Sequence, residues 1–215
     1  MKSLNVIIKP RREASITDEQ LFELYKDAYS QWLDTGLESS WHEFTQDDFE
    51  QFCQSASRSI VTVAIDKETG ELLGAHTLFA NKKKGVVNGS ALAVASKAKR
   101  KGIATALLRY EAEKARNAGY RCMKGITAID AAWSVNWHLK NGYRIVGYKR
   151  LETDNHPSYV FRLQLQPSLL WSGPFAPVTA RLCYLFSYII TSLAKDSQGH
   201  LTFLGHLIKH LAISD

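Results

Sequence analysis

The sequence predicts a mixed α and β fold (α/β in the α+β sense), in which a mostly antiparallel central sheet is flanked by helices. Apolar residues switch between the alternating period of strands and the longer period of helices, in the order β-α-α-β-β-β-α-β-α-β-β. Short turns separate several consecutive strands, as is typical of antiparallel pairs. Residues 166–215 add two apolar helical patterns, which predict a C-terminal helical hairpin after the sheet.

The first part of the chain predicts a strand, two helices and three strands. Thr17 and Gln20 have the spacing of a capping box, and the apolar residues that follow recur at helical intervals. Thr45 and Asp48 can start the second helix in the same way. The expected strands are residues 5–10, 59–66, 71–80 and 86–95, with turns at 67–70 and 81–85.

The most informative stretch is a strand that enters a helix through a cationic turn. The strand 91–95 leads to Gly102, and Ile103 opens an amphipathic helix that ends before Gly119. The first N–H groups of a helix have no intrahelical partner, and the helix dipole adds positive potential, so an anion can bind there. Gly102 permits close backbone approach. Four cations surround the turn: Lys97, Lys99, Arg100 and Lys101. We therefore expect a polyphosphate ligand.

Downstream, the pattern predicts a strand, a short helix and a β-hairpin. The strand spans 122–129, the helix spans 133–141, and Gly142-Tyr143 follows. Two alternating segments, 144–151 and 158–165, are separated by turn-forming residues.

This pair of motifs resembles the GNAT family of N-acetyltransferases. Its acetyl-CoA pyrophosphate loop has the pattern Arg/Gln-x-x-Gly-x-Gly/Ala after a strand. Here Lys99, Gly102 and Ala104 fill those positions, with Lys in place of Arg or Gln. The family's second signature ends in Tyr-x-x-x-Gly-Phe, which His138-Leu-Lys-Asn-Gly142-Tyr143 resembles. The resemblance covers roughly residues 5–165, so it implies an acyl-CoA N-acyltransferase domain at 1–165 and a helical extension at 166–215.

The resemblance implies direct transfer of the acetyl group of acetyl-CoA to an amine. The backbone of Leu92 and Val94 would bond the pantetheine amides. The other residues implied in acetyl-CoA binding are Lys99, Arg100, Lys101, Gly102, Ile103, Ala104, Thr105 and Ser134. His138 stands where the family usually has Tyr, so it would protonate the leaving thiolate as a general acid. A histidine that only packs on its helix is the alternative.

The acceptor side is less defined by the sequence. Trp41 lies in the loop that resembles the acceptor-binding region, and His76 lies on a strand next to the one that would bind acetyl-CoA. We name both as candidate substrate-binding residues, and His76 also as a candidate base, acting directly or through water. A loop anchor and a core histidine are the alternatives. The acceptor is a small-molecule amine or a protein amine.

Charge is distributed unevenly along the chain. Residues 1–80 have a net charge of −7, whereas residues 81–165 have a net charge of +12. A polyanionic cosubstrate accounts for the basic part, and an acidic acceptor wall would suit a cationic amine. A nucleic-acid-binding protein is an alternative, but neither basic cluster has interleaved aromatic residues for base stacking, so we expect no nucleic-acid partner. A degenerate member that binds CoA without turnover is a further alternative.

The three cysteines, Cys53, Cys122 and Cys183, are far apart and match no metal or redox spacing. They indicate a reducing cytoplasm and neither a disulfide framework nor a metal site. The N-terminus has no apolar signal segment. Arg181 interrupts the apolar run of the tail, so we expect no transmembrane helix. The tail hairpin would pack on the domain, form a homodimer or lie on a membrane surface.

Overall fold

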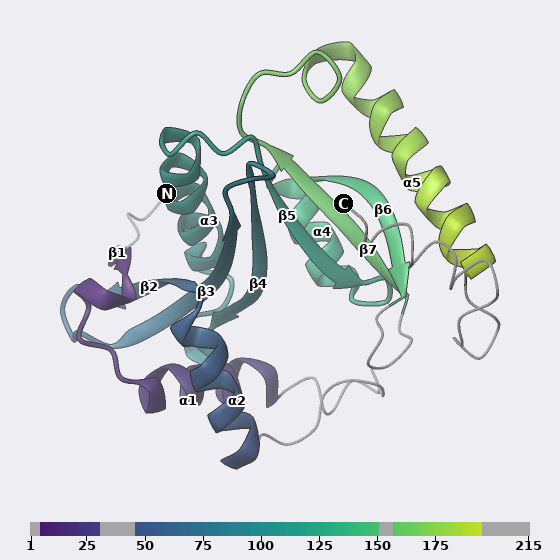
Figure 1. Cartoon of the computed structure of the whole chain (residues 1–215). Helices are drawn as coiled ribbons and strands as arrows, with labels where there is room; N and C mark the ends of the chain where they lie inside the picture. The colour runs from purple at the N-terminus through teal and green to yellow at the C-terminus, as the bar shows by residue number, and fades with distance from the viewer. Residues whose placement is uncertain (1–4, 31–45, 151–156, 195–215) are drawn as a thin grey trace. The chain divides into compact units, whose positions relative to one another are not determined.

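The computed structural model describes residues 5–30, 46–150 and 157–194 (Figure 1). Its contacts divide the chain into two compact units, one ending at Met123 and the other beginning at Lys124. The boundary expected between residues 165 and 166 lies inside the second unit, so that division of the chain stays a prediction.

Four antiparallel strands form the sheet of the first unit. Their register pairs each strand with the next one along the chain. They are β1 (Val6–Pro10), β2 (Ile60–Asp66), β3 (Leu72–Asn81) and β4 (Val86–Val94). Each begins and ends within one residue of its predicted bounds, because alternation and turn residues mark these limits directly in the sequence.

Three helices accompany this sheet: α1 (Asp18–Ser30), α2 (Gln46–Ser57) and α3 (Ile103–Asn117). Thr77 contacts α1 through Tyr25, whereas its neighbour His76 contacts α3 through Glu111. Consecutive strand residues point to opposite faces, so α1 and α3 cover opposite faces of the sheet (Figure 1).

The helix ends follow the sequence signals. Thr17 and Gln20 form the predicted capping box: the Gln20 N–H donates to Thr17 Oγ1 at 3.2 Å, and the Thr17 N–H donates to Gln20 Oε1 at 3.0 Å. Gly119 has a φ of +82°, and the Tyr120 N–H donates to Ala115 O, so the left-handed glycine ends α3 as expected.

The core of the first unit lies between the sheet and these helices. Its apolar side chains come from α1, α3 and the strands β2, β3 and β4. The most completely buried of them are Leu21, Val63, Ala64, Ala75, Ala93 and Leu107. Tyr25 is also buried, although it carries a hydroxyl.

A β-bulge interrupts the pairing of β3 with β4. Leu92 lies opposite His76 and Gly89 lies opposite Leu78, so Ser90 and Ala91 together face the single residue Thr77. A bulge leaves the extra residue outside the regular hydrogen-bond ladder and bends its strand.

The described residues of the second unit form strands in the spatial order β5-β7-β6, together with helices α4 and α5. Strands β6 and β7 form the predicted hairpin, with a bulge between Ile145 and Gly147. The elements are β5 (Cys122–Ala128), α4 (Ala132–Lys140), β6 (Arg144–Arg150), β7 (Pro157–Gln164) and α5 (Ala176–Ala194). Mostly antiparallel strands flanked by helices in both units confirm the predicted fold class.

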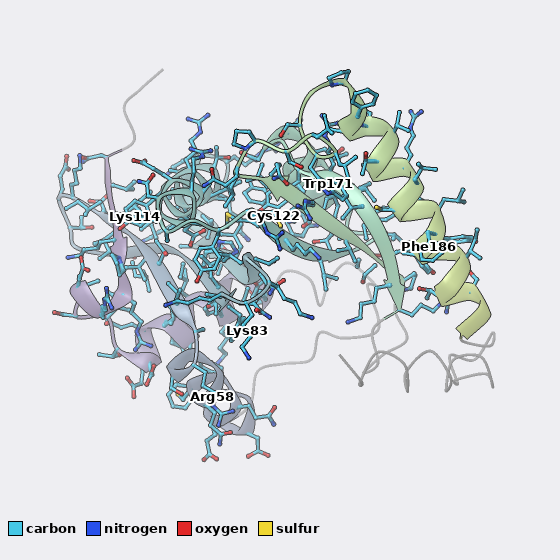
Figure 2. All side chains as sticks on the ribbon, turned by 45° about the horizontal axis from the view of Figure 1, so that its top comes forward. Arg58, Lys83, Lys114, Cys122, Trp171 and Phe186 are labelled. Atoms are coloured by element: carbon cyan, nitrogen blue, oxygen red, sulfur yellow. The ribbon has the colours of Figure 1, made fainter. Side chains whose placement is uncertain are left out.

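Helix α5 packs along β6. The Tyr148 N–H donates to Ser187 Oγ at 2.7 Å, and Thr191 Oγ1 donates to Tyr148 O at 3.4 Å. The opposite side of α5 is apolar and exposed, at Val178, Leu182, Leu185, Phe186 and Ile189 (Phe186 is labelled in Figure 2). No helix within the described residues combines the length and hydropathy needed to cross a bilayer. The second helical pattern of the tail, at 200–212, lies outside the described residues.

Candidate functional site

The cationic turn forms as the sequence predicts. After β4, a 3₁₀ turn (Ser96–Ala98) leads to Gly102, which has a φ of +88° and is the N-cap of α3. The first helical bond runs from the Ala106 N–H to Gly102 O, so the N–H groups of Ile103–Thr105 have no partner within the helix. Neither a capping side chain nor an acidic residue occupies this first turn. The turn therefore presents unneutralised donors and positive potential, which suit a phosphate.

The four cations near the turn differ in their surroundings. Lys97 forms an ion pair with Glu71, so part of its charge is already neutralised. Lys99 is half-buried and its Nζ lies 3.5 Å from Ala28 O; burial lowers the pKa of Lys99, and nearby Asp27 opposes this shift. Arg100 and Lys101 are exposed. Of the four, these last two are the most accessible to an anion.

The β4 backbone has hydrogen-bonding groups that point away from β3. The Ala95 N–H donates to Leu73 O, so Ala95 and Leu73 are a hydrogen-bonded pair of the β3–β4 ladder. Hydrogen-bonded pairs alternate along an antiparallel ladder, so Ala93 and Ala75 are the next such pair. Leu92 and Val94 occupy the alternate positions, where N–H and C=O point away from β3. The strand register therefore directs the N–H and C=O groups of Leu92 and Val94 toward the edge of β4 that faces away from β3.

His76 lies on the α3 side of the sheet and does not line the hollow beside α1. Its imidazole Nδ1 is 2.6 Å from Glu111 Oε2, and both side chains are buried. The other carboxylate oxygen, Glu111 Oε1, is buried and has no hydrogen-bond partner among the described residues. This buried pair links β3 to α3. Binding of the amine substrate by His76 stays a prediction. Trp41 lies outside the described residues.

His138 is held by its own helix and by aromatic rings. Its Nδ1 lies 2.8 Å from Ser134 O, and its ring stacks on Phe161 with a centroid distance of 4.4 Å. Because a carbonyl only accepts, Nδ1 carries the proton, and Nε2 carries one only in the imidazolium form. A Cβ built on Gly125 would lie 3.0 Å from Nε2, so the glycine lets the ring approach β5 closely. Ser134, a residue implied in acetyl-CoA binding, is buried and its Oγ lies 2.8 Å from Thr127 Oγ1.

A hollow with a volume of about 410 Å³ lies beside α1. Asp27, Glu71 and Lys97 line it, but no residue of the turn 99–105 does. In the turn itself, Arg100, Lys101 and Gly102 are exposed.

Helix α1 contributes contacts that the sequence reasoning did not identify. Tyr25 Oη donates to Ala91 O at 3.0 Å, and Tyr29 Oη donates to Leu92 O at 3.1 Å. The Ser96 N–H donates to Asp27 Oδ2 at 2.7 Å. The last two turns of α1 therefore hold both β4 and the beginning of the cationic turn. The sequence feature that could have indicated these contacts is the spacing of Tyr25 and Tyr29, which lie four residues apart on the apolar side of this helix.

Comparison with known proteins identifies the class. The profile of the acetyltransferase (GNAT) family matches residues 19–143. This range includes all of α1 except Asp18, and it includes β4, the cationic turn, α4 and Tyr143. The chain therefore belongs to the GNAT acetyltransferase family, whose members are acyltransferases. Among curated proteins no sequence match was found.

Solved structures agree on the fold. An N-acetyltransferase from Staphylococcus aureus Mu50 has 20% sequence identity and a TM-score of 0.56, covering 76% of this chain and 100% of its own. An aminoglycoside 6'-N-acetyltransferase complexed with coenzyme A has 16% identity and a TM-score of 0.57, covering 75% and 98%. A GNAT acetyltransferase from Elizabethkingia anophelis with acetyl-CoA bound has 17% identity and a TM-score of 0.55, covering 74% and 98%.

Proposed function

We propose that this protein transfers the acetyl group of acetyl-CoA to an amine by direct attack of the amine nitrogen on the thioester. The proposal rests on family membership together with one observation: the N–H groups of Ile103–Thr105 lack partners within the helix, behind an exposed glycine. This arrangement fits the pyrophosphate of acetyl-CoA. Acetyl-CoA supplies the activated acyl group in this reaction.

The cationic turn and β4 have separate roles in the proposed reaction. The N–H groups after Gly102 bind the pyrophosphate, and Arg100 and Lys101 add charge to that contact. The outward C=O group of Leu92 and the outward N–H and C=O groups of Val94 bond the pantetheine amides and align the thioester along β4. Holding the two reactants in this alignment contributes much of the acceleration.

His138 in the second unit is the proposed general acid. With Nδ1 bonded to Ser134 O, the imidazolium form can give its Nε2 proton to the departing thiolate. The stack on Phe161 fixes the plane of the ring. The acceptor is a small-molecule or protein amine, which must be deprotonated before it attacks.

Replacing Gly102 tests the binding step. Gly102→Val places a Cβ where the phosphate must approach and strains a backbone with φ of +88°, so CoA affinity measured by titration calorimetry should be lost. Gly70→Val is the matched control, because Gly70 also has a positive φ, of +72°, and a Cβ there meets nothing within 4 Å. Each substitution should destabilise the fold by about 1–2 kcal/mol. Equal CoA affinity in the two variants would contradict the proposed phosphate site.

A screen of acceptors tests the reaction itself. Release of free thiol from acetyl-CoA is followed with small amines, amino sugars and peptides with a free N-terminus. We expect release that depends on at least one amine and mass spectra that show one added acetyl group. Tight CoA binding with no acetylation of any amine would overturn the enzymatic proposal and indicate a protein that binds CoA without turnover.

A further inference from the structure

The carbonyl of Ala91 lies at the bulge of β4, where the regular ladder is interrupted. Ser90 and Ala91 share the single opposing residue Thr77, so the ladder alone does not provide each of their backbone groups with a partner. Ala91 is half-buried, and a carbonyl that is shielded from water is unfavourable without a hydrogen bond. The side chains of α1 fill this gap.

Tyr25 bonds to this carbonyl through a short chain of hydroxyl groups. Its Oη lies 3.0 Å from Ala91 O and 2.9 Å from Thr77 Oγ1. A carbonyl can only accept, so the single phenol proton goes to Ala91 O, and the Thr77 hydroxyl donates to Tyr25. Tyr25 is 2% exposed, and its burial raises the pKa of the phenol, so the phenol keeps that proton throughout the physiological range.

The peptide group that Tyr25 holds also carries the Leu92 N–H. In a planar trans peptide, C=O and N–H point in opposite directions. Ala91 O points toward Tyr25 and Thr77, and the Leu92 N–H therefore points to the edge of β4 away from β3, in agreement with the register. A hydrogen bond to the carbonyl also polarises the N–H of the same peptide, which makes it a better donor.

Tyr29 holds the next peptide group. Its Oη donates to Leu92 O at 3.1 Å, and its ring stacks on Tyr25 with a centroid distance of 5.8 Å. Burial raises the pKa of Tyr29 as well, so it too remains a donor. The two tyrosines, one helical turn apart, thus fix both peptide planes that flank Leu92.

We propose that Tyr25 and Tyr29 are positioning residues that aim the Leu92 N–H at the thioester carbonyl of acetyl-CoA. The inference rests on the proposed function, in which the β4 backbone binds the acetyl donor. The carbonyl oxygen of a thioester gains negative charge when an amine attacks it, so a fixed, polarised N–H stabilises the transition state more than the ground state. The tyrosines act through the backbone and do not touch the substrate.

Tyr25→Phe tests this role because it removes one oxygen and keeps the ring. With the acceptor saturating, we expect kcat to fall about tenfold, less than the about 10²–10³-fold lost when an oxyanion donor is removed outright. The KM for acetyl-CoA and the affinity for CoA should stay within about twofold, since the phosphate turn is intact. Thr77→Val removes the hydroxyl that donates to Tyr25 and should lower kcat less. Tyr110→Phe removes a phenol oxygen on α3 and serves as the matched control.

A spectroscopic measurement separates positioning from stability. Acetyl-CoA labelled with a heavy isotope at the acetyl carbonyl is bound to each variant, and the infrared stretch of that carbonyl is recorded below the melting temperature. The carbonyl stretching frequency of acetyl-CoA bound to the wild type should be lower than that of acetyl-CoA in a water-free solvent. Tyr25→Phe should reverse part of this decrease. Tyr29→Phe should act in the same direction, whereas Tyr110→Phe should leave the band unchanged.

The outcomes distinguish this inference from the function beneath it. A wild-type protein that neither binds acetyl-CoA nor releases thiol overturns the proposed function, and the positioning role with it. A wild type that binds and turns over, with kcat and carbonyl stretch unchanged in Tyr25→Phe and Tyr29→Phe, overturns only the positioning role. A fall in kcat with an unchanged carbonyl stretch also rules against it.

Discussion

Glu111→Ala should destabilise the protein far more than an ordinary helix substitution, because Glu111 is the buried partner of His76. The Glu111 side chain is 2% exposed and the His76 side chain is 7% exposed, with 2.6 Å between Oε2 and Nδ1. Removing one partner leaves the buried imidazole without its hydrogen bond and opens a cavity beside it. Breaking a buried pair of this kind costs about 3–5 kcal/mol.

That loss is large against a typical unfolding free energy of about 5–15 kcal/mol. At about 2–4 °C per kcal/mol for a chain of this size, the melting temperature should fall by about 6–20 °C, measured by circular dichroism. Glu113→Ala is the matched control, since Glu113 is an exposed glutamate on the same helix. It should change the unfolding free energy by no more than about 0.5 kcal/mol.

The double variant His76→Leu with Glu111→Met sharpens the test. Glu111 Oε1 has no partner among the described residues, so the native pair is incompletely satisfied. Replacing both groups with apolar side chains should therefore recover most of the lost stability. A Glu111→Ala variant as stable as Glu113→Ala would refute the buried pair. A stable double variant with normal turnover would show that His76 is not the base.

The remaining predictions concern the second unit. His138→Ala should lower the single-turnover rate of acetyl transfer by about 10²–10⁴-fold. His138→Tyr should restore part of this rate, whereas His138→Phe keeps the stack on Phe161 and should not restore it. A wild-type rate in His138→Ala would show that this histidine only packs. Removal of residues 166–215 should increase the binding of a hydrophobic dye or change the oligomeric state, because α5 packs along β6 and its loss exposes that surface. A full-length protein that partitions wholly into membranes and needs detergent to remain in solution would contradict the prediction that the tail helices are not transmembrane.

Local patterns in the sequence predicted most of the fold. The capping box at Thr17, the glycine at the end of α3 and the strand limits all depend on residues within a few positions of one another, so their geometry follows from local chemistry. The cationic turn belongs to the same category. Its φ of +88° at Gly102 agrees with the need for a glycine there.

The contacts that complete the candidate site join distant parts of the chain. Tyr25 is 66 residues from Ala91, and His76 is 35 residues from Glu111. Periodicity identified Tyr25 as a core position and gave no indication that its hydroxyl meets a bulge. The pairing of Lys97 with Glu71 likewise depends on how β3 and the turn come together, and a simple count of cations could not anticipate it.

The contact between α5 and β6 has a consequence for how copies of this protein can meet. Strand β6 is last in the order β5-β7-β6, and the end strand of a sheet usually offers unpaired backbone groups to a foreign strand. Here the Tyr148 N–H and C=O are hydrogen-bonded to Ser187 and Thr191 of α5, so they are not available to pair with an incoming strand. Growth of the sheet from one molecule into the next is thereby disfavoured at β6, and self-association on this side would proceed through helix surfaces instead.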